Sequence, residues 1–191
     1  MDRVFVPGRF GRFAFAIFCI GSLVGIIVFL ETLAPHFDAY HQTISELALE
    51  PNGYLLGVAF CALSFSLFLL GWQWRATPLH LVGKGLILAG LFFLVTGGVP
   101  LTLSVGIHVF SVMFALVFWM LSIYGMLRHP RVASKLRVFS GVIFGLVLLL
   151  GVLGPHGLPL GLLERLVLLI LLGWQIVVSI FTYVKSFSLL I

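Results

Sequence analysis

The chain has 191 residues, of which 61% are hydrophobic and 9% are charged, with 11 basic and 6 acidic side chains. A typical soluble domain is about 45–50% apolar and about 25% charged, so this composition excludes an ordinary soluble enzyme, a disordered protein and a soluble nucleic-acid-binding protein. The net charge of +5 therefore points to no nucleic-acid partner, because in a membrane protein the positions of the basic residues matter more than their sum. We expect a single transmembrane domain over residues 1–191.

Six apolar runs predict six transmembrane helices. A hydrocarbon core about 30 Å thick needs about 20 helical residues, and in lipid a continuously apolar run can satisfy its backbone only as a helix. The third and fifth runs are short and need flanking residues to reach both interfaces. The predicted fold is an all-α, six-transmembrane-helix bundle with spans at about 13–33, 54–72, 85–99, 107–127, 138–153 and 162–184.

The positions of the basic residues predict the orientation of the bundle. When six spans alternate, 10 of the 11 lysines and arginines lie on one side. Positive charge is retained on the cytoplasmic side, so we expect a multi-pass protein of the inner or plasma membrane with both termini cytoplasmic. Arg165 is the exception, and a charge at that depth is costly unless it pairs. We expect Arg165 to pair with Glu31 or with an acid of the first outer loop, which would fix that loop over the bundle.

The first outer loop contains the signature of a short helix. Thr43 and Glu46 form a T-x-x-E capping box, in which two side chains satisfy free backbone donors. Ile44, Leu47 and Ala48 would then share an apolar face. We expect a short interfacial helix lying on the bundle. Glu46 either caps this helix and does nothing more, or also faces a pocket.

Ionisable side chains concentrate on the predicted outer face. That face or its border carries all acidic residues except Asp2 and four of the six histidines. The residues concerned are Glu31, Asp38, Glu46, Glu50, Glu164, His36, His41, His108 and His156. Since they come from three loops at one membrane depth, they predict a shared site, and separate local hydrogen bonding is the alternative.

The first functional hypothesis is an outward-facing polar pocket that binds a lipid or amphiphile. Its predicted ligand-binding residues are Arg165, Glu164, Glu46, His108 and His156. A guanidinium is well suited to a phosphate or carboxylate, because it donates two parallel hydrogen bonds. Membrane lipid is the expected partner.

The second hypothesis is a membrane-embedded hydrolase acting at the outer leaflet. Ser45, Glu46 and Asp38 are its candidate catalytic residues, with a carboxylate as general base. Zinc is a candidate cofactor, because zinc bound by histidines lowers the pKa of a bound water. The candidate metal ligands are His36, His41, His108 and His156. The H-x-D-x-x-H spacing at residues 36–41 fits no regular element that would aim all three side chains at one point, so a solvated loop is the alternative.

A third hypothesis is an accessory subunit of a larger complex, with a homo-oligomer or another membrane protein as the partner. Haem is not expected, because the histidines lie near the ends of spans and no second pair lies on the opposite side.

Four short motifs occur in order along the chain: I-S-E-L at 44–47, G-G-V-P at 97–100, G-I-H at 106–108 and G-L-L-E-R at 161–165. With them the chain resembles, over about residues 13–184, the family catalogued as domain of unknown function 998, bacterial and archaeal polytopic membrane proteins. The resemblance implies a six-helix-type bundle with these outward motifs grouped together, and no established reaction. It departs from the family pattern at residue 99, where valine replaces the expected phenylalanine before proline. The residues that it singles out are Ser45, Glu46, Pro100, His108, Glu164 and Arg165.

A looser likeness, of composition alone, is to alkaline-ceramidase-like membrane hydrolases, which combine a serine, an aspartate and three histidines around zinc. This chain has Ser45, Asp38, His108 and His156 on one predicted side, but it lacks an H-x-x-x-H pair on the last span. The likeness is consistent with the hydrolase hypothesis without locating a site.

Overall fold

The computed structural model of the protein describes residues 9–75 and 77–184. In these two ranges it contains six long α-helices, one short 3-10 helix named η1 (Ile44–Leu49), and no strands. The long helices are α1 (Arg9–Leu33), α2 (Tyr54–Trp74), α3 (His80–Gly98), α4 (Val105–Arg128), α5 (Ser134–Gly157) and α6 (Leu160–Val184). All six are long and apolar enough to cross a membrane. The predicted all-α, six-helix fold of a multi-pass membrane protein is therefore confirmed.

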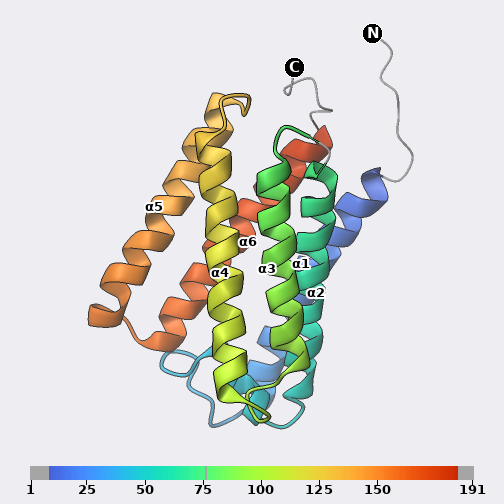
Figure 1. Ribbon diagram of the computed structural model, residues 1–191. Coiled ribbons are helices and arrows are strands. Elements are labelled where there is room, and N and C mark those ends of the chain that lie inside the picture. Colours follow the sequence, from blue (N-terminus) through green and yellow to red (C-terminus); the bar gives the residue numbers. More distant parts are fainter. Residues whose placement is uncertain (1–8, 76, 185–191) are drawn as a thin grey trace.

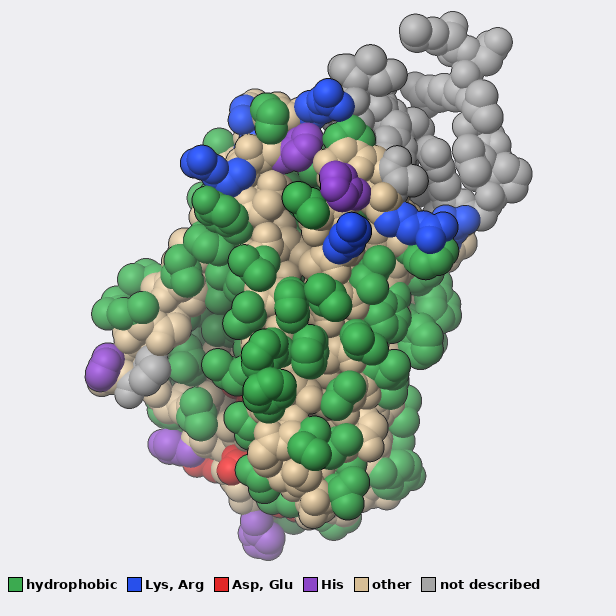
Figure 2. All heavy atoms as spheres, in the orientation of Figure 1, with side chains coloured by type: hydrophobic (Ala, Val, Ile, Leu, Met, Phe, Trp, Pro, Cys, Tyr) green, Lys and Arg blue, Asp and Glu red, His purple; other side chains and the backbone are tan. Residues whose placement is uncertain are grey.

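The helices run alternately up and down between two ends of a bundle (Figure 1). α1 begins and α6 finishes at the end where α2 connects to α3 and α4 to α5. We call this the basic end, because lysines and arginines gather there (Figure 2). The opposite end carries η1, and we call it the η1 end. That the basic end faces the cytoplasm stays a prediction from this charge asymmetry.

The packing is densest among the first four helices. α2 and α3 make the most extensive contact, followed by α3 with α4 and α1 with α2. α5 packs more loosely on α4 and α6, is the least buried of the six helices, and leans away from the others toward the η1 end (Figure 1). The most closely packed part of the bundle therefore lies around α2 and α3.

Glycine pairs bring α2 and α3 into backbone contact at both ends. A Cβ atom built on Gly57 would lie 2.7 Å from the carbonyl oxygen of Gly97, and the reverse distance is also 2.7 Å. Gly71 and Gly83 form the same arrangement at 2.6 Å near the basic end. Lipid provides no hydrophobic force between helices, so close packing of small residues is a main source of their association.

Buried polar side chains connect α6 to α2 and to α5. Gln175 Nε2 donates to Ser66 Oγ of α2 at 2.6 Å, and Trp174 Nε1 donates to Ser140 Oγ of α5 at 3.0 Å. All four side chains are buried. In hydrocarbon such groups need protein partners, so these bonds fix the rotation of α6 against its neighbours.

The predicted spans agree with the helices except at their ends. α3 begins at His80, before the predicted residue 85, and α5 extends from Ser134 to Gly157, beyond the predicted 138–153. The helices thus extend beyond both short apolar runs into the flanking residues, and this gives them the length that a membrane crossing requires. The placement of His156 in a loop is wrong, because it lies in the last turn of α5.

The glycine contact predicts the effect of a single methyl group. Gly83→Ala should lower the free energy of unfolding by about 1–3 kcal/mol, the usual range for overpacking, because the new Cβ would meet backbone atoms of α2. Thermal unfolding of the purified protein in detergent measures this. Gly98→Ala in the same helix is the control, because nothing lies within 4 Å of its Cβ position. Equal stability of the two variants would contradict close contact at Gly83.

Candidate functional site

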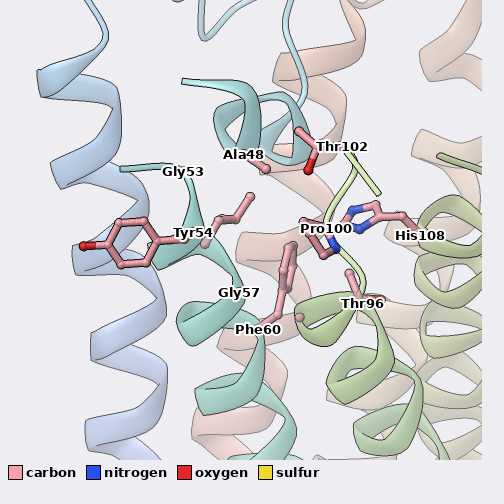
Figure 3. A pocket seen from close by; sticks show the side chains of 11 residues that line it. Ala48, Gly53, Tyr54, Gly57, Phe60, Thr96, Pro100, Thr102 and His108 are labelled. Carbon is pink, nitrogen blue, oxygen red and sulfur yellow. The ribbon is translucent and has the colours of Figure 1, made fainter. Parts of the chain in front are cut away.

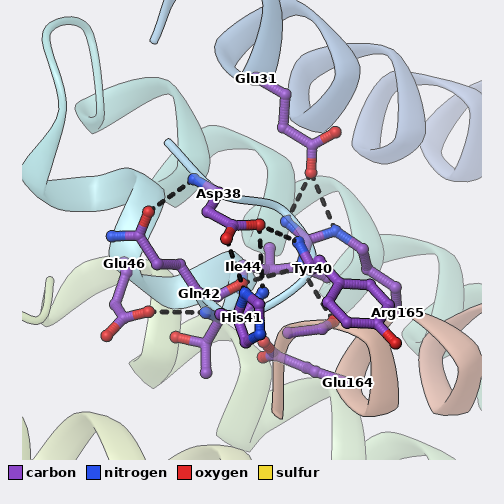
Figure 4. Close-up of polar contacts among 11 residues, drawn as sticks. Glu31, Asp38, Tyr40, His41, Gln42, Ile44, Glu46, Glu164 and Arg165 are labelled. Carbon is purple, nitrogen blue, oxygen red and sulfur yellow. Dashed lines mark hydrogen bonds and ion pairs between the residues drawn. The ribbon is translucent and has the colours of Figure 1, made fainter. Parts of the chain in front are cut away.

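The loop between α1 and α2, residues 34–53, folds over the η1 end and is held there by Arg165 (Figure 4). Arg165 Nε and Nη2 donate to Glu31 Oε1 at 3.0 and 2.6 Å, and Nη1 donates to the carbonyl oxygens of Gln42 and Gly161, both at 2.9 Å. These bonds occupy four of the five N–H donors of a guanidinium. The Arg165 and Glu31 side chains are only 17% and 25% exposed. The predicted pairing of Arg165 with Glu31 is thus confirmed.

Two carboxylates hold the start of η1 (Figure 4). Glu164 Oε2 accepts the backbone N–H of Ile44 at 2.6 Å, and Glu46 Oε2 accepts that of Thr43 at 2.6 Å. The first N–H groups of a helix lack partners within the helix, so both bonds stabilise η1. Glu46 therefore caps the helix, as the T-x-x-E spacing predicts. Both carboxylates bind backbone rather than facing the cavity described below.

The first turn of α6 also binds the loop through its backbone. The N–H groups of Gly161 and Leu162 donate to the carbonyl oxygens of His41 and Tyr40, at 3.2 and 3.0 Å. A Cβ at Gly161 would collide with the carbonyl oxygen of Gln42. Only glycine permits so close an approach, so this position gives a physical reason for the first residue of the G-L-L-E-R motif.

The H-x-D-x-x-H segment forms a solvated turn. Asp38 Oδ2 lies 2.6 Å from His41 Nδ1, with side chains 54% and 66% exposed, and His36 is also exposed. The hydrogen bond with His41, followed by that from the Tyr40 N–H, holds the pKa of Asp38 below its usual value. Asp38 is therefore an ionised surface carboxylate bound to its neighbours.

His108, in the first turn of α4, lies at the centre of a second group of contacts. Its side chain is buried, with an exposed fraction of 2%. Nε2 lies 3.0 Å from Ser45 Oγ, and Nδ1 lies 2.9 Å from the carbonyl oxygen of Val99. A carbonyl can only accept, so the hydrogen-bond network assigns the proton to Nδ1. Nε2 then accepts the hydroxyl proton of Ser45, and this bond connects η1 to α4.

A cavity of about 240 Å³ adjoins His108, between η1, α2, α3 and α4 (Figure 3). Ala48 of η1 covers it, and Tyr54 and Phe60 lie along its α2 side. Thr96 of α3 and the following loop form the opposite side. The cavity therefore lies at the η1 end of the most tightly packed helices.

A smaller cavity of about 150 Å³ lies between α1 and α6. Glu31 and Arg165 line it together with apolar side chains such as Val28 and Leu169. Because four of the five N–H donors of Arg165 already bind Glu31 and two carbonyls, a bidentate contact with an anionic ligand here would have to displace an existing partner. Its contacts therefore fit a structural role of Arg165.

The structure distributes the predicted site residues over separate places. Arg165, Glu164 and Glu46 hold the loop, whereas Ser45 and His108 are bonded to each other, and His108 lines the cavity of about 240 Å³. His156 is exposed in the last turn of α5. In residues 9–75 and 77–184 no three His, Cys, Asp or Glu side chains form a group that could hold a metal ion. The candidate zinc ligands are thus not brought together in this part of the chain.

Sequence reasoning missed several residues of the cavity beside His108. Tyr54, Gly57, Phe60 and Thr96 line it, and none was predicted as a site residue. Only their position in the sequence could have indicated them, because all four lie near span ends on the same predicted side of the membrane as His108. Nothing in the sequence could have indicated the role of the Val99 carbonyl, since every residue has a carbonyl group.

The ion pair predicts strong coupling between two positions. Glu31→Gln and Arg165→Gln should each lower the free energy of unfolding by about 1–3 kcal/mol, because each leaves a partly buried charge without its partner. The double variant should lose less than the sum of the two. Arg165→Lys should also be less stable than the wild type, because an ammonium group cannot reproduce the planar hydrogen-bonding geometry of the guanidinium group. Additive losses in thermal unfolding experiments would contradict the pairing.

Because the histidines lie apart in the structure, we predict that the purified protein binds little zinc. We expect elemental mass spectrometry of the protein, purified without chelators, to find well under one zinc per chain. His108→Ala should leave this value unchanged, because both ring nitrogens already have partners within the protein. About one zinc per chain in the wild type, lost in His108→Ala, would contradict this expectation.

Comparison with known proteins agrees with the four sequence motifs. The family model described as "Protein of unknown function (DUF998)" matches residues 8–180, which cover nearly all of the six-helix bundle. No curated protein and no solved structure shows a significant match. The chain belongs to the DUF998 family of proteins of unknown function.

Proposed function

We propose that this membrane protein binds part of a lipid or amphiphile in the cavity beside His108, at the predicted outer leaflet. The observation that carries the proposal is the cavity itself, which lies where four helix ends meet and combines apolar walls with a few polar groups. Ligand sites are typically concave and mostly apolar, with a small number of placed polar groups.

The size of the cavity limits what it can hold. Pockets for drug-sized ligands are usually about 300–1,000 Å³, and this cavity has about 240 Å³. It therefore suits one part of an amphiphile, such as a polar linkage with a short adjoining segment. The remaining chain would lie along the apolar outer surface of the bundle, where Tyr54 is 73% exposed at the cavity edge.

The lining favours an uncharged group. Among the described residues that line the cavity there is no lysine, arginine, aspartate or glutamate. The Thr96 hydroxyl donates to the carbonyl oxygen of Phe92 at 2.9 Å and keeps its capacity to accept. Thr102 is exposed in the loop between α3 and α4. An ester, an amide or a glycerol hydroxyl fits these neighbours better than a phosphate does, because an unpaired charge would lose hydration there.

Two glycines explain how packed helices leave this space. Gly57 and Gly97 line the cavity, and their backbones are in contact. The contact brings the helices together, while the absence of side chains leaves room beside it. The cavity is thus a consequence of the same packing that holds α2 and α3 together.

Filling the cavity from η1 tests the proposal. Ala48→Trp should weaken binding of a pyrene-labelled monoacylglycerol at least about tenfold, which corresponds to about 1.4 kcal/mol. Fluorescence anisotropy of the purified protein in detergent measures the dissociation constant. Leu49→Trp is the matched control, because Leu49 is the next residue of η1, is 58% exposed and does not line the cavity. Equal affinity of the two variants, or no saturable binding to the wild type, would overturn the proposal.

A further inference from the structure

We propose that Ser45 and His108 form a nucleophile and base that hydrolyse a lipid ester bound in the adjoining cavity. This inference rests on the proposed function, because it names an ester as the substrate class of that cavity. It needs no metal, since the groups involved are side chains and one backbone carbonyl of this chain.

The contacts match the geometry of an activated serine. Such sites place the nucleophile within about 2.6–3.2 Å of a base that a third group orients. Here Ser45 Oγ lies 3.0 Å from His108 Nε2, and the carbonyl oxygen of Val99 lies 2.9 Å from Nδ1. The carbonyl takes the position of the usual carboxylate. It fixes the tautomer in which Nε2 is free to take the hydroxyl proton.

Other buried serines of the bundle behave differently. Ser64, Ser111 and Ser122 each donate to a backbone carbonyl oxygen, as hydroxyls in apolar helices commonly do. Such a bond satisfies the donor without activating the oxygen. The Ser45 hydroxyl is instead bonded to an imidazole, which can accept its proton.

Both partners are held firmly in place. The start of η1 is fixed by Glu164 and by the Glu46 cap, so Ser45 has a defined backbone position. The His108 ring is buried and meets the Phe60 ring edge-on, with centroids 6.2 Å apart. Catalytic geometry depends on this kind of support from surrounding residues.

The base of the pair lines the cavity. Ser45, with an exposed fraction of 9%, is not a lining residue and reaches the cavity through its bond to His108 Nε2. The uncharged lining suits the carbonyl of an ester. A substrate ester in the cavity therefore lies beside the imidazole that serves as the base.

The reaction balances in two steps. Ser45 Oγ attacks the ester carbonyl carbon while its proton moves to His108 Nε2, and the alcohol leaves with that proton as the carbon–oxygen bond breaks. Water then attacks the acyl-serine, giving a proton to Nε2. The carboxylic acid leaves, and the proton returns to Ser45 Oγ. Water is the only co-reactant.

A covalent probe tests the pair in the intact protein. Membranes containing the full chain are treated with a biotinylated fluorophosphonate, which phosphonylates activated serines, and the adduct is located by mass spectrometry of peptides. We expect an adduct on Ser45 in the wild type and none there in Ser45→Ala. Ser111→Ala is the control, because Ser111 lies one turn from His108 and should leave labelling of Ser45 unchanged.

The role of His108 as the base is tested by the rate at which Ser45 is labelled. His108→Gln should slow labelling of Ser45 at least about 100-fold, the lower range for loss of a general base. Release of fatty acid from monoacylglycerol by the reconstituted protein should be lost in the same two variants, Ser45→Ala and His108→Gln. The absence of an adduct on Ser45 in the wild type would overturn the inference. This result does not depend on whether any variant folds. Labelling of folded His108→Gln at the wild-type rate would also overturn it.

The binding assay separates this inference from the proposed function. Ser111→Ala should bind the pyrene-labelled monoacylglycerol as the wild type does, because Ser111 does not line the cavity. If the wild type binds this lipid and forms no adduct, the cavity is a binding site and the Ser45–His108 bond is structural. If Ser45 is labelled but no monoacylglycerol binds, the pair stands and the proposed ligand class is wrong.

Discussion

An arginine near the start of a membrane helix must satisfy its N–H donors, because an unpaired charge at that depth is costly. In this protein Arg165 does so with the Glu31 carboxylate and with backbone carbonyls that include that of Gln42. One side chain thereby joins α1, the following loop and α6. With the bonds of Glu164 and Glu46, these contacts hold the loop and η1 over the bundle. Ser45 and Ala48 belong to η1, so the same contacts support the position of Ser45 against His108 and that of Ala48 over the cavity.

The second constraint is the contact between α2 and α3. Gly57 and Gly97 let the two backbones touch at the η1 end, and the loop after α3 then brings the Val99 carbonyl to His108. The imidazole thus receives its orientation from α3 and its hydroxyl partner from η1. Three parts of the chain meet at one ring, so the short motifs around residues 45, 99 and 108 lie close together although they are far apart in sequence.

Much of the fold could be predicted from local patterns. The apolar runs identified all six helices, and the T-x-x-E spacing identified the helix that Glu46 caps. The unusual position of Arg165 predicted a partner that is either Glu31 or an acid of the first outer loop, and in the structure it is Glu31. The site was predicted less well. Arg165 and His108 were expected to share a pocket, but they lie in different cavities, and His156 is exposed on α5.

The order of apolar and charged residues in the sequence was sufficient to determine that this chain forms six helices able to span a membrane. It also determined that the acidic residues other than Asp2 lie at one end of these helices. These properties depend on the depth of each residue, and depth can be read from the order of residues along a span. Which side chains meet at that end depends on the rotation and the neighbours of each helix. Those are set by contacts between distant residues, such as Gly57 with Gly97 and Arg165 with Glu31. Only the tertiary structure could therefore bring Ser45 to His108 and separate both from Arg165.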